Sequence, residues 1–118
     1  MSWNDTALMD RIEHYLDVTA YRHNLLVGNV ANIDTPHYHT RDIDFQSELR
    51  RAELQLTPEK TEPHVHEVLG LIERPDGNNV SMDREGLLLA ETQLGFRVGV
   101  QLLQNRFQRL LQAIREGS

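Results

Sequence analysis

The stretch "MDREGLLLAETQLGFRVGVQLLQNRFQRLLQAI", residues 82–114, decides the fold, because its apolar residues repeat with a fixed period. Every seventh position is apolar: Met82, Leu89, Phe96, Leu103 and Leu110. The positions four residues beyond each of these are Gly86, Gln93, Val100, Phe107 and Ile114. A repeat of seven that is sustained over such a length is typical of a coiled coil. The stretch therefore predicts one long helix, which we place at residues 80–116, with Ser81 or Asn79 as its N-cap.

Two further features of this helix indicate how it packs. Leu87, Leu94, Leu102 and Leu111 widen the apolar face beyond a single seam, which favours contact with more than one neighbour. Gly95 and Gly99 lie about one turn apart, and glycines at that spacing favour close approach of a second helix.

The N-terminal stretch carries a similar repeat. Its apolar residues are Met9, Ile12, Leu16, Leu26, Val30 and Ile33, and Thr19 and His23 fill the two missing places. Spacings of three and four predict an amphipathic helix, here about 40 Å long over residues 6–32 at 1.5 Å per residue. We place the N-terminal helix at residues 1–33.

Between the two helices, residues 34–79 predict a turn and an irregular middle. Pro58, Pro63 and Pro75 and the turn signal Asp76-Gly77 interrupt regular structure. "IDFQSELRRAEL" predicts a short helix from about Asp44 to Leu54, and "VHEVLGLIERPDGNNV" contains short apolar runs that suit a strand or hairpin.

The fold class that follows is mainly α, in a single domain over residues 1–118. Two long terminal helices pack as a coiled-coil-like pair or assembly, and the irregular middle carries the short helix and a small hairpin. With 118 residues, 39% apolar, the chain is close to the size at which one core becomes marginal. These numbers suit elongated helices that complete their burial in an assembly.

Composition excludes several functional classes. The net charge of −6 leaves no strongly basic face, so we expect no nucleic-acid partner. The absence of cysteine excludes disulfides and thiolate metal sites. The N-terminus shows no pattern of a cleavable signal peptide, and no apolar run approaches the roughly 20 residues of a membrane span.

The phrase "NVANIDTPHYHTRDIDF", residues 29–45, follows the N-terminal helix and predicts a fixed bend. Asn32 tolerates the left-handed conformation that ends helices, and Asp34 suits an Asx turn. Pro36 makes Thr35 extended. The predicted turn motif comprises Asn29, Asn32, Asp34, Thr35, Pro36, Tyr38, Asp42, Asp44 and Phe45, and we expect Tyr38, Ile43 and Phe45 to form a small satellite core under the bend.

Part of this phrase, "GNVANIDTPHY" (28–38), resembles the N-terminal signature of bacterial flagellar axial proteins, Ala-Asn-x-Ala-Asn-x-x-Thr-Pro-Gly-Tyr. "RDIDFQSEL" (41–49) and "DGNNVSMDRE" (76–85) resemble the proximal-rod, FlgB-type branch of that family. The chain departs from the pattern at three positions. His37 stands where the family usually has Gly, Gly28 where it has Ala, and Ser81 where it has Asp.

The resemblance implies a non-enzymatic structural subunit of the proximal rod in the flagellar basal body. It implies type III export to the periplasm without a cleaved signal peptide, and a helical tube of terminal helices that transmits torque between the membrane ring and the distal rod. Implied partners are other rod proteins, the FliE-type adaptor between rod and membrane ring, the export gate and further copies of the chain. No cofactor is implied. The residues that we expect to pack helices in the assembly are Met9, Ile12, Leu16, Leu26, Val30, Leu89, Phe96, Val100, Leu103, Phe107, Leu110 and Ile114.

Two alternatives stay open: another flagellar rod protein, or a coiled-coil adaptor that binds metal. His37, His39, His64 and His66 form two His-x-His pairs, each able to chelate Zn²⁺ or Ni²⁺ from an extended segment. Nothing in the sequence joins the two pairs, so we expect no metal site.

An enzymatic function has little support in the sequence. Asp42 and Asp44 share a face if the chain is extended there, as many solvated acids do. No nucleophile elbow, phosphate-binding loop or nucleotide fingerprint is present. We therefore expect no enzyme and no small-molecule substrate.

Overall fold

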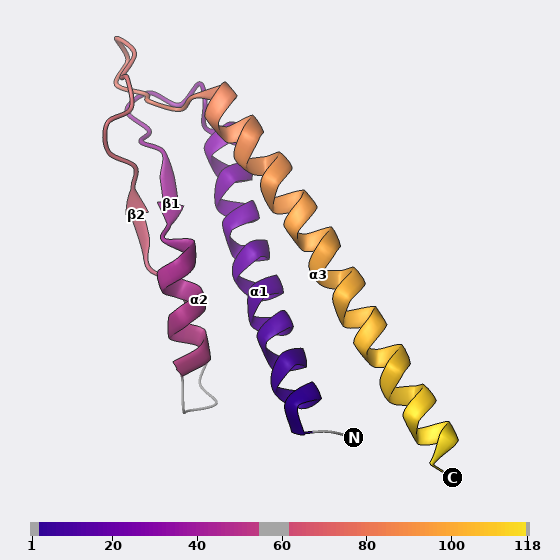
Figure 1. Ribbon diagram of the computed structural model, residues 1–118. Helices are drawn as coiled ribbons and strands as arrows, with labels where there is room; N and C mark the ends of the chain where they lie inside the picture. The colour runs from indigo at the N-terminus through magenta and orange to yellow at the C-terminus, as the bar shows by residue number, and fades with distance from the viewer. Residues whose placement is uncertain (1–2, 55–61, 118) are drawn as a thin grey trace.

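A computed structural model describes residues 3–54 and 62–117 and confirms the mainly α fold with two long terminal helices (Figure 1). Pro58 lies outside the described residues. The elements, in chain order, are α1 (Trp3–Ala31), β1 (Arg41–Ile43), α2 (Phe45–Leu54), β2 (Val65–Glu67) and α3 (Met82–Glu116).

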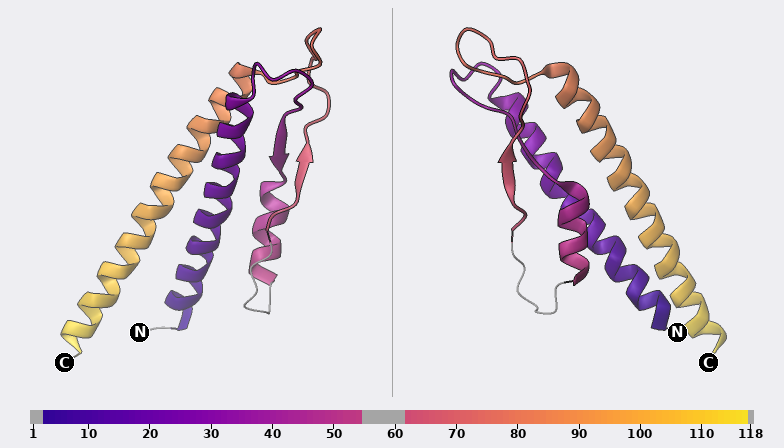
Figure 2. Two further views of the ribbon diagram at one scale, coloured as in Figure 1. Left: turned by 180° about the vertical axis from the view of Figure 1, so that it is seen from behind. Right: turned by 60° about the vertical axis from the view of Figure 1, so that its left-hand side comes forward.

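Helix α1 is the central element. It packs against α3 on one side and against α2 and β1 on the other (Figure 1). Helices α1 and α3 run antiparallel, so the two ends of the chain lie at the same end of an elongated molecule of 68 × 28 × 18 Å (Figure 2). The two helices diverge toward these ends in Figure 1. The buried apolar core is small and comprises Ile12, Val18, Leu26, Ile43 and Val80.

The two strands of the small sheet precede and follow α2 in the sequence. Strands β1 and β2 pair antiparallel, with Arg41 opposite Glu67 and Ile43 opposite Val65. The strand predicted after residue 64 is therefore present, but its partner precedes α2 and is not a second part of residues 65–80. The predicted short helix is also present, and the carboxylate of Asp44 accepts the Ser47 amide at 3.2 Å as its cap.

The ends of the long helices are set by side-chain hydrogen bonds. Of the two predicted caps of α3, Ser81 fills the role, because its hydroxyl accepts the Arg84 amide at 3.2 Å. The predicted left-handed residue at the end of α1 was misplaced. Asn32 instead donates through Nδ2 to the Gly28 carbonyl at 2.8 Å, and the non-glycine residue with positive φ among the described residues is His37, at 63°.

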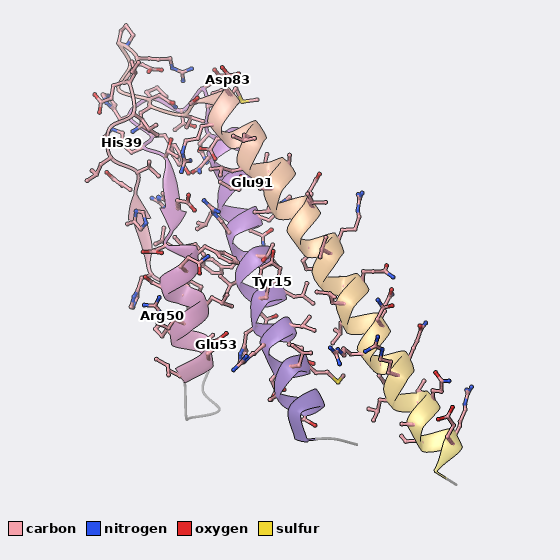
Figure 3. All side chains as sticks on the ribbon, viewed as in Figure 1. Tyr15, His39, Arg50, Glu53, Asp83 and Glu91 are labelled. Carbon is pink, nitrogen blue, oxygen red and sulfur yellow. The ribbon has the colours of Figure 1, made fainter. Side chains whose placement is uncertain are left out.

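The close approach predicted at two glycines of α3 is confirmed. A Cβ added at Gly99 would lie 2.7 Å from Cδ2 of Leu16, and one added at Gly95 would collide with the hydroxyl of Tyr15. Both contacts come from the middle of α1, where Figure 3 shows Tyr15. The two long helices are therefore in close contact at their centres.

Candidate functional site

Helix α3 does not turn its apolar stripe directly toward α1. Its most deeply buried residues are Glu85, Thr92 and Gly99, which are spaced by seven. Each lies three residues after a member of the predicted stripe, which corresponds to a rotation of about 60° around the helix. Small and polar side chains therefore face α1, and the apolar stripe is turned onto one side of α3.

We call this side the α3 flank, defined by Phe96, Val100, Leu103, Phe107 and Ile114. Val100 and Leu103 are half-buried, whereas Phe107 is 52% and Ile114 61% exposed. The side chains of the last turns of α3 project into solvent with no neighbouring element (Figure 3). The flank is thus an open apolar surface within the isolated chain.

The other predicted packing residues are more enclosed. Ile12 and Leu26 are buried, and the half-buried ones are Met9, Leu16, Val30, Leu89 and Leu110. A second apolar face on α3 consists of Leu87, Leu94, Val98 and Leu102, and Leu87 is 65% exposed. Helix α3 therefore presents apolar residues on two sides.

A groove of about 600 Å³ runs beside the flank, between α1 and α3. We call it the seam groove; α1 contributes Thr19, Ala20, His23 and Asn24, and α3 contributes Thr92, Gln93, Phe96, Arg97, Val100 and Gln101. Nδ1 of His23 lies 3.0 Å from Oγ1 of Thr92 and links the two helices across it. A smaller groove, of about 270 Å³, lies where Leu49 and Glu53 of α2 approach α1 and α3.

A cluster of polar side chains lies at the end of the molecule opposite the chain termini, where α1 ends and α3 begins. We call it the polar corner, and Asn29 within it is fully buried. Nδ2 of Asn29 donates to the Arg41 carbonyl at 2.8 Å and to Oε2 of Glu85 at 3.1 Å. Oδ1 accepts the Arg41 amide at 3.0 Å and the Tyr38 hydroxyl at 2.9 Å. One carboxamide therefore joins α1 to the turn, to β1 and to α3.

An ion-pair ladder runs through the same corner. Arg22 donates to both carboxylate oxygens of Asp42 at 3.0 Å, Arg84 donates to Oδ2 of Asp42 at 2.9 Å, and Arg84 also donates to Oε1 of the buried Glu85 at 2.6 Å. Two cations thus neutralise two buried anions, as buried charges require.

These contacts set the ionisation of Asp42. Burial acts to raise the pKa of Asp42, but the hydrogen bonds from Arg22, from the Ile43 amide and from Arg84 outweigh it, so the pKa lies below its ordinary value of 3.8. Asp42 is therefore a charged structural link between α1, β1 and α3.

Two adjacent asparagines complete the corner before α3 begins. Nδ2 of Asn78 donates to the carbonyls of Asn32 and Thr35, both at 2.9 Å. Oδ1 of Asn79 accepts the Thr40 amide at 2.7 Å and the Thr40 hydroxyl at 2.9 Å. The three sequence motifs that are separated along the chain therefore meet at one place.

The bend itself contains a residue with a left-handed backbone, His37. Its φ of 63° is left-handed, and its amide donates to the Asp76 carbonyl at 2.9 Å. Gly77, with φ of 83°, passes so close that a Cβ there would lie 2.7 Å from Nδ1 of His37. The position at which His replaces the usual Gly thus does have positive φ.

The remaining members of the predicted turn motif have separate roles. Thr35 and Pro36 are exposed, and Asp34 is exposed without the predicted Asx turn in the described part of the chain. Asp44 caps α2, and the ring of Phe45 packs edge-on against Tyr15, with centroids 5.6 Å apart.

The four histidines of the two His-x-His pairs are not brought into one cluster. Within residues 3–54 and 62–117, no group of three or more His, Asp or Glu side chains is arranged to hold a metal ion. His39 lies between Glu67 and Glu73, and the hydrogen bond with Glu67 raises its pKa above the ordinary value. The sequence suggested that Asp42 and Asp44 could share a face. In the structure Asp42 belongs to the ion-pair ladder, and Asp44 caps α2.

Sequence reasoning did not predict the role of five residues in the corner, namely Arg22, Asn78, Asn79, Arg84 and Glu85. One signal was available, because Glu85 is in heptad phase with Thr92 and Gly99 and thus marks the side that faces α1. None of the helices in the described ranges is long and apolar enough to cross a membrane.

Comparison with known proteins gives consistent relatives, although no family model matches the chain. A flagellar basal body rod protein FlgB of Cereibacter sphaeroides is 38% identical over 106 residues, which cover 80% of this chain and 83% of that protein. The FlgB of Salmonella typhimurium is 31% identical over 123 aligned positions, covering 87% and 89%. The FlgB of Escherichia coli is 29% identical over the same length.

Proposed function

The chain belongs to the FlgB family of flagellar basal-body rod proteins, and on that premise we propose that its terminal helices build the proximal rod by packing against those of neighbouring subunits. Family membership makes it a structural component of the basal-body rod. The proposal adds how it assembles: side by side in a helical tube that transmits torque between the membrane ring and the distal rod.

The observation that carries the proposal is the open α3 flank. Phe107 and Ile114 are more than half exposed although they continue the same stripe as the half-buried Val100 and Leu103. Burying one such side chain contributes about 1.5–3 kcal/mol. A row of them along one helix supplies enough free energy to hold subunits together, and an apolar row of that length is unusual on a protein that works alone.

The polar corner supports a role in transmitting force. Asn29 and the ladder through Asp42 and Arg84 fix the relative positions of α1, β1 and α3 at one end of the subunit. A load applied to one helix then passes to the others through buried hydrogen bonds and ion pairs, and is not taken up by rotation at the bend.

The slender shape supports export in an unfolded form. The described part of the chain buries few apolar side chains, so the isolated subunit gains little from folding alone. We propose that it passes through the flagellar type III apparatus to the periplasm without a cleaved signal, and that assembly supplies the remaining burial. Its contacts would be the export gate, the FliE-type adaptor and the next rod proteins.

The experiment that tests the proposal uses a pair of adjacent residues. Phe107→Asp places a charge on the α3 flank, and Gln108→Asp places the same charge beside it on an exposed polar position. In cells, we expect Phe107→Asp to abolish swimming and rod assembly while the subunit is still exported. Gln108→Asp should leave swimming near normal. Normal basal bodies in the Phe107→Asp strain would contradict the proposal.

A further inference from the structure

The imidazole of His39, labelled in Figure 3, lies between two carboxylates from different parts of the chain. Its Nδ1 is 3.2 Å from Oε2 of Glu67, which belongs to β2. Its Nε2 is 2.9 Å from Oε1 of Glu73, which belongs to the loop between β2 and α3. All three side chains are partly exposed, so water reaches the ring and a proton can enter and leave it.

Only the charged form of the ring suits both neighbours. A carboxylate accepts hydrogen bonds and donates none at neutral pH, whereas a neutral imidazole carries one N–H and one lone pair. A neutral His39 would therefore turn a lone pair toward one of the two anions. The imidazolium carries an N–H on each nitrogen, so it meets both anions with the favourable charge.

The surroundings of the ring favour this charged form. The hydrogen bond with Glu67 raises the pKa of His39 above its ordinary value of 6.5, although removal of water from the ring opposes the shift. The charge of Glu73 and the backbone of Gly77 also raise this pKa.

Other titratable side chains lie within a few residues of this cluster, namely His37, Arg41, His66, Arg74 and Asp76. Arg41 is opposite Glu67 in the strand register, and Arg74 pairs with Asp76 at 3.8 Å. None of the five forms an ion pair with the cluster in the part of the chain that the structure describes. The two glutamates are therefore the charged groups that bear directly on the ring.

The loop that carries Glu73 spans residues 68–76 and is joined to the bend at its two ends. The Val68 amide donates to the Thr40 carbonyl at 2.9 Å, and the Asp76 carbonyl accepts the His37 amide at 2.9 Å. The ion pair from Glu73 to the bend lies between these two backbone hydrogen bonds. It is therefore placed to control how closely the loop follows the bend.

We propose that His39 is a pH-sensitive clasp, which holds the 68–76 loop against the bend when charged and loosens it when the proton leaves. Leu69 and Ile72 within this loop are each 91% exposed. The clasp thus controls how firmly the chain presents these two apolar side chains to its surroundings. Every contact of the clasp lies within one copy, so the inference does not depend on the proposed assembly.

The pH range of the clasp follows from the direction of the pKa shift. Because the pKa of His39 is higher in the folded chain than its ordinary value, the link is complete below pH 6.5 and is lost as pH rises through the folded-state pKa. Ion pairs this exposed are weak, so we expect the loop to loosen while the remaining fold persists.

Nuclear magnetic resonance of the full-length chain tests the protonation step. The ring signal of His39, assigned by its absence in His39→Gln, should titrate with a pKa above 6.5. Glu73→Gln removes one of the two anions and should lower this pKa. Glu53→Gln, at an exposed position on the far end of α2 in Figure 3, should leave it unchanged. A pKa at or below 6.5, or one that Glu73→Gln does not lower, would overturn the clasp.

Hydrogen exchange tests the movement of the loop. Relative to an unfolded chain at the same pH, the Val68 amide should lose about threefold in protection between about pH 5.5 and about pH 8.5. In His39→Gln, which is uncharged at both pH values, this protection should be the same at both. The Arg41 amide, which donates to Asn29, is the internal control and should stay equally protected. Protection of the Val68 amide that does not change with pH in the natural chain would refute the proposal.

Discussion

The carboxamide of Asn29 pairs with the backbone of Arg41 as a neighbouring strand would. Its Nδ2 donates to the Arg41 carbonyl at 2.8 Å, and its Oδ1 accepts the Arg41 amide at 3.0 Å. A side chain on α1 therefore satisfies both backbone groups of the residue that opens β1. These two hydrogen bonds join the bend to α1. They fix the direction of the backbone at Arg41, because hydrogen bonds to a peptide group constrain the orientation of its plane.

Asn29→Asp should be strongly destabilising for this reason. It removes the donor to the Arg41 carbonyl and places a second carboxylate against Glu85, whose Oε2 now lies 3.1 Å from Nδ2. We expect a loss of about 2–4 kcal/mol in the free energy of unfolding. Urea denaturation followed by circular dichroism measures it. Asn24→Asp, exposed on the same helix, is the matched control and should change stability by less than about 0.5 kcal/mol.

The ion-pair ladder predicts that the folded chain loses stability at acid pH. The pKa of Asp42 is lower in the folded chain than its ordinary value of 3.8, so the stability it contributes is present above that value and is lost as pH falls through the lower, folded-state pKa. We expect Asp42→Asn to cost about 3 kcal/mol at neutral pH and to flatten the fall in stability below pH 3.8. Asp34→Asn, at an exposed position, controls for the change in charge. An unchanged acid profile in Asp42→Asn would exclude the ladder as its cause.

His37→Gly should stabilise the chain. A left-handed φ of 63° strains a side chain that carries a Cβ, and glycine relieves that strain. Because glycine also raises the entropy of the unfolded chain, the net gain should be modest, about 0.5–1 kcal/mol. His37→Val, β-branched at the same position, should lose at least about 1 kcal/mol. Thermal denaturation of the two variants tests this prediction. Equal melting temperatures would show that the bend tolerates either residue.

The long helices were predictable from sequence because their apolar repeats are local. The side of α3 that faces α1 was predictable only in part. The spacing of Gly95 and Gly99 indicated the close approach, but the repeat of large residues lies on another side of the helix and gave no sign that the polar Thr92 would be buried. The polar corner was even harder to predict from the sequence. Asn29 and Glu85 are 56 residues apart, and no local pattern connects an asparagine at the end of one helix to a glutamate at the start of another.

The glycines of α3 give a paired test of that packing. At Gly86 an added Cβ meets nothing within 4 Å, so Gly86→Ala should gain up to about 1 kcal/mol from helix propensity. At Gly99 the same change forces Leu16 aside, and the overpacking should outweigh the propensity gain by about 1–2 kcal/mol. Chemical denaturation of both variants measures the difference. A gain at Gly99 would mean that α1 and α3 separate readily at their centre.

The helicity of the isolated chain should increase with its concentration. Residues 107–116 of α3 are exposed except for the half-buried Leu110, so in dilute solution these turns lack the packing on which short helical stretches depend. A second copy that covers the α3 flank would offset the entropy of ordering them. Far-ultraviolet circular dichroism across a concentration series should show the gain, and hydrogen exchange should place it in these last turns while amides at the polar corner stay protected throughout. Phe107→Asp should abolish the increase and Gln108→Asp should keep it. A dilute chain whose last turns already resist exchange, and whose melting is independent of concentration, would show that the flank needs no partner.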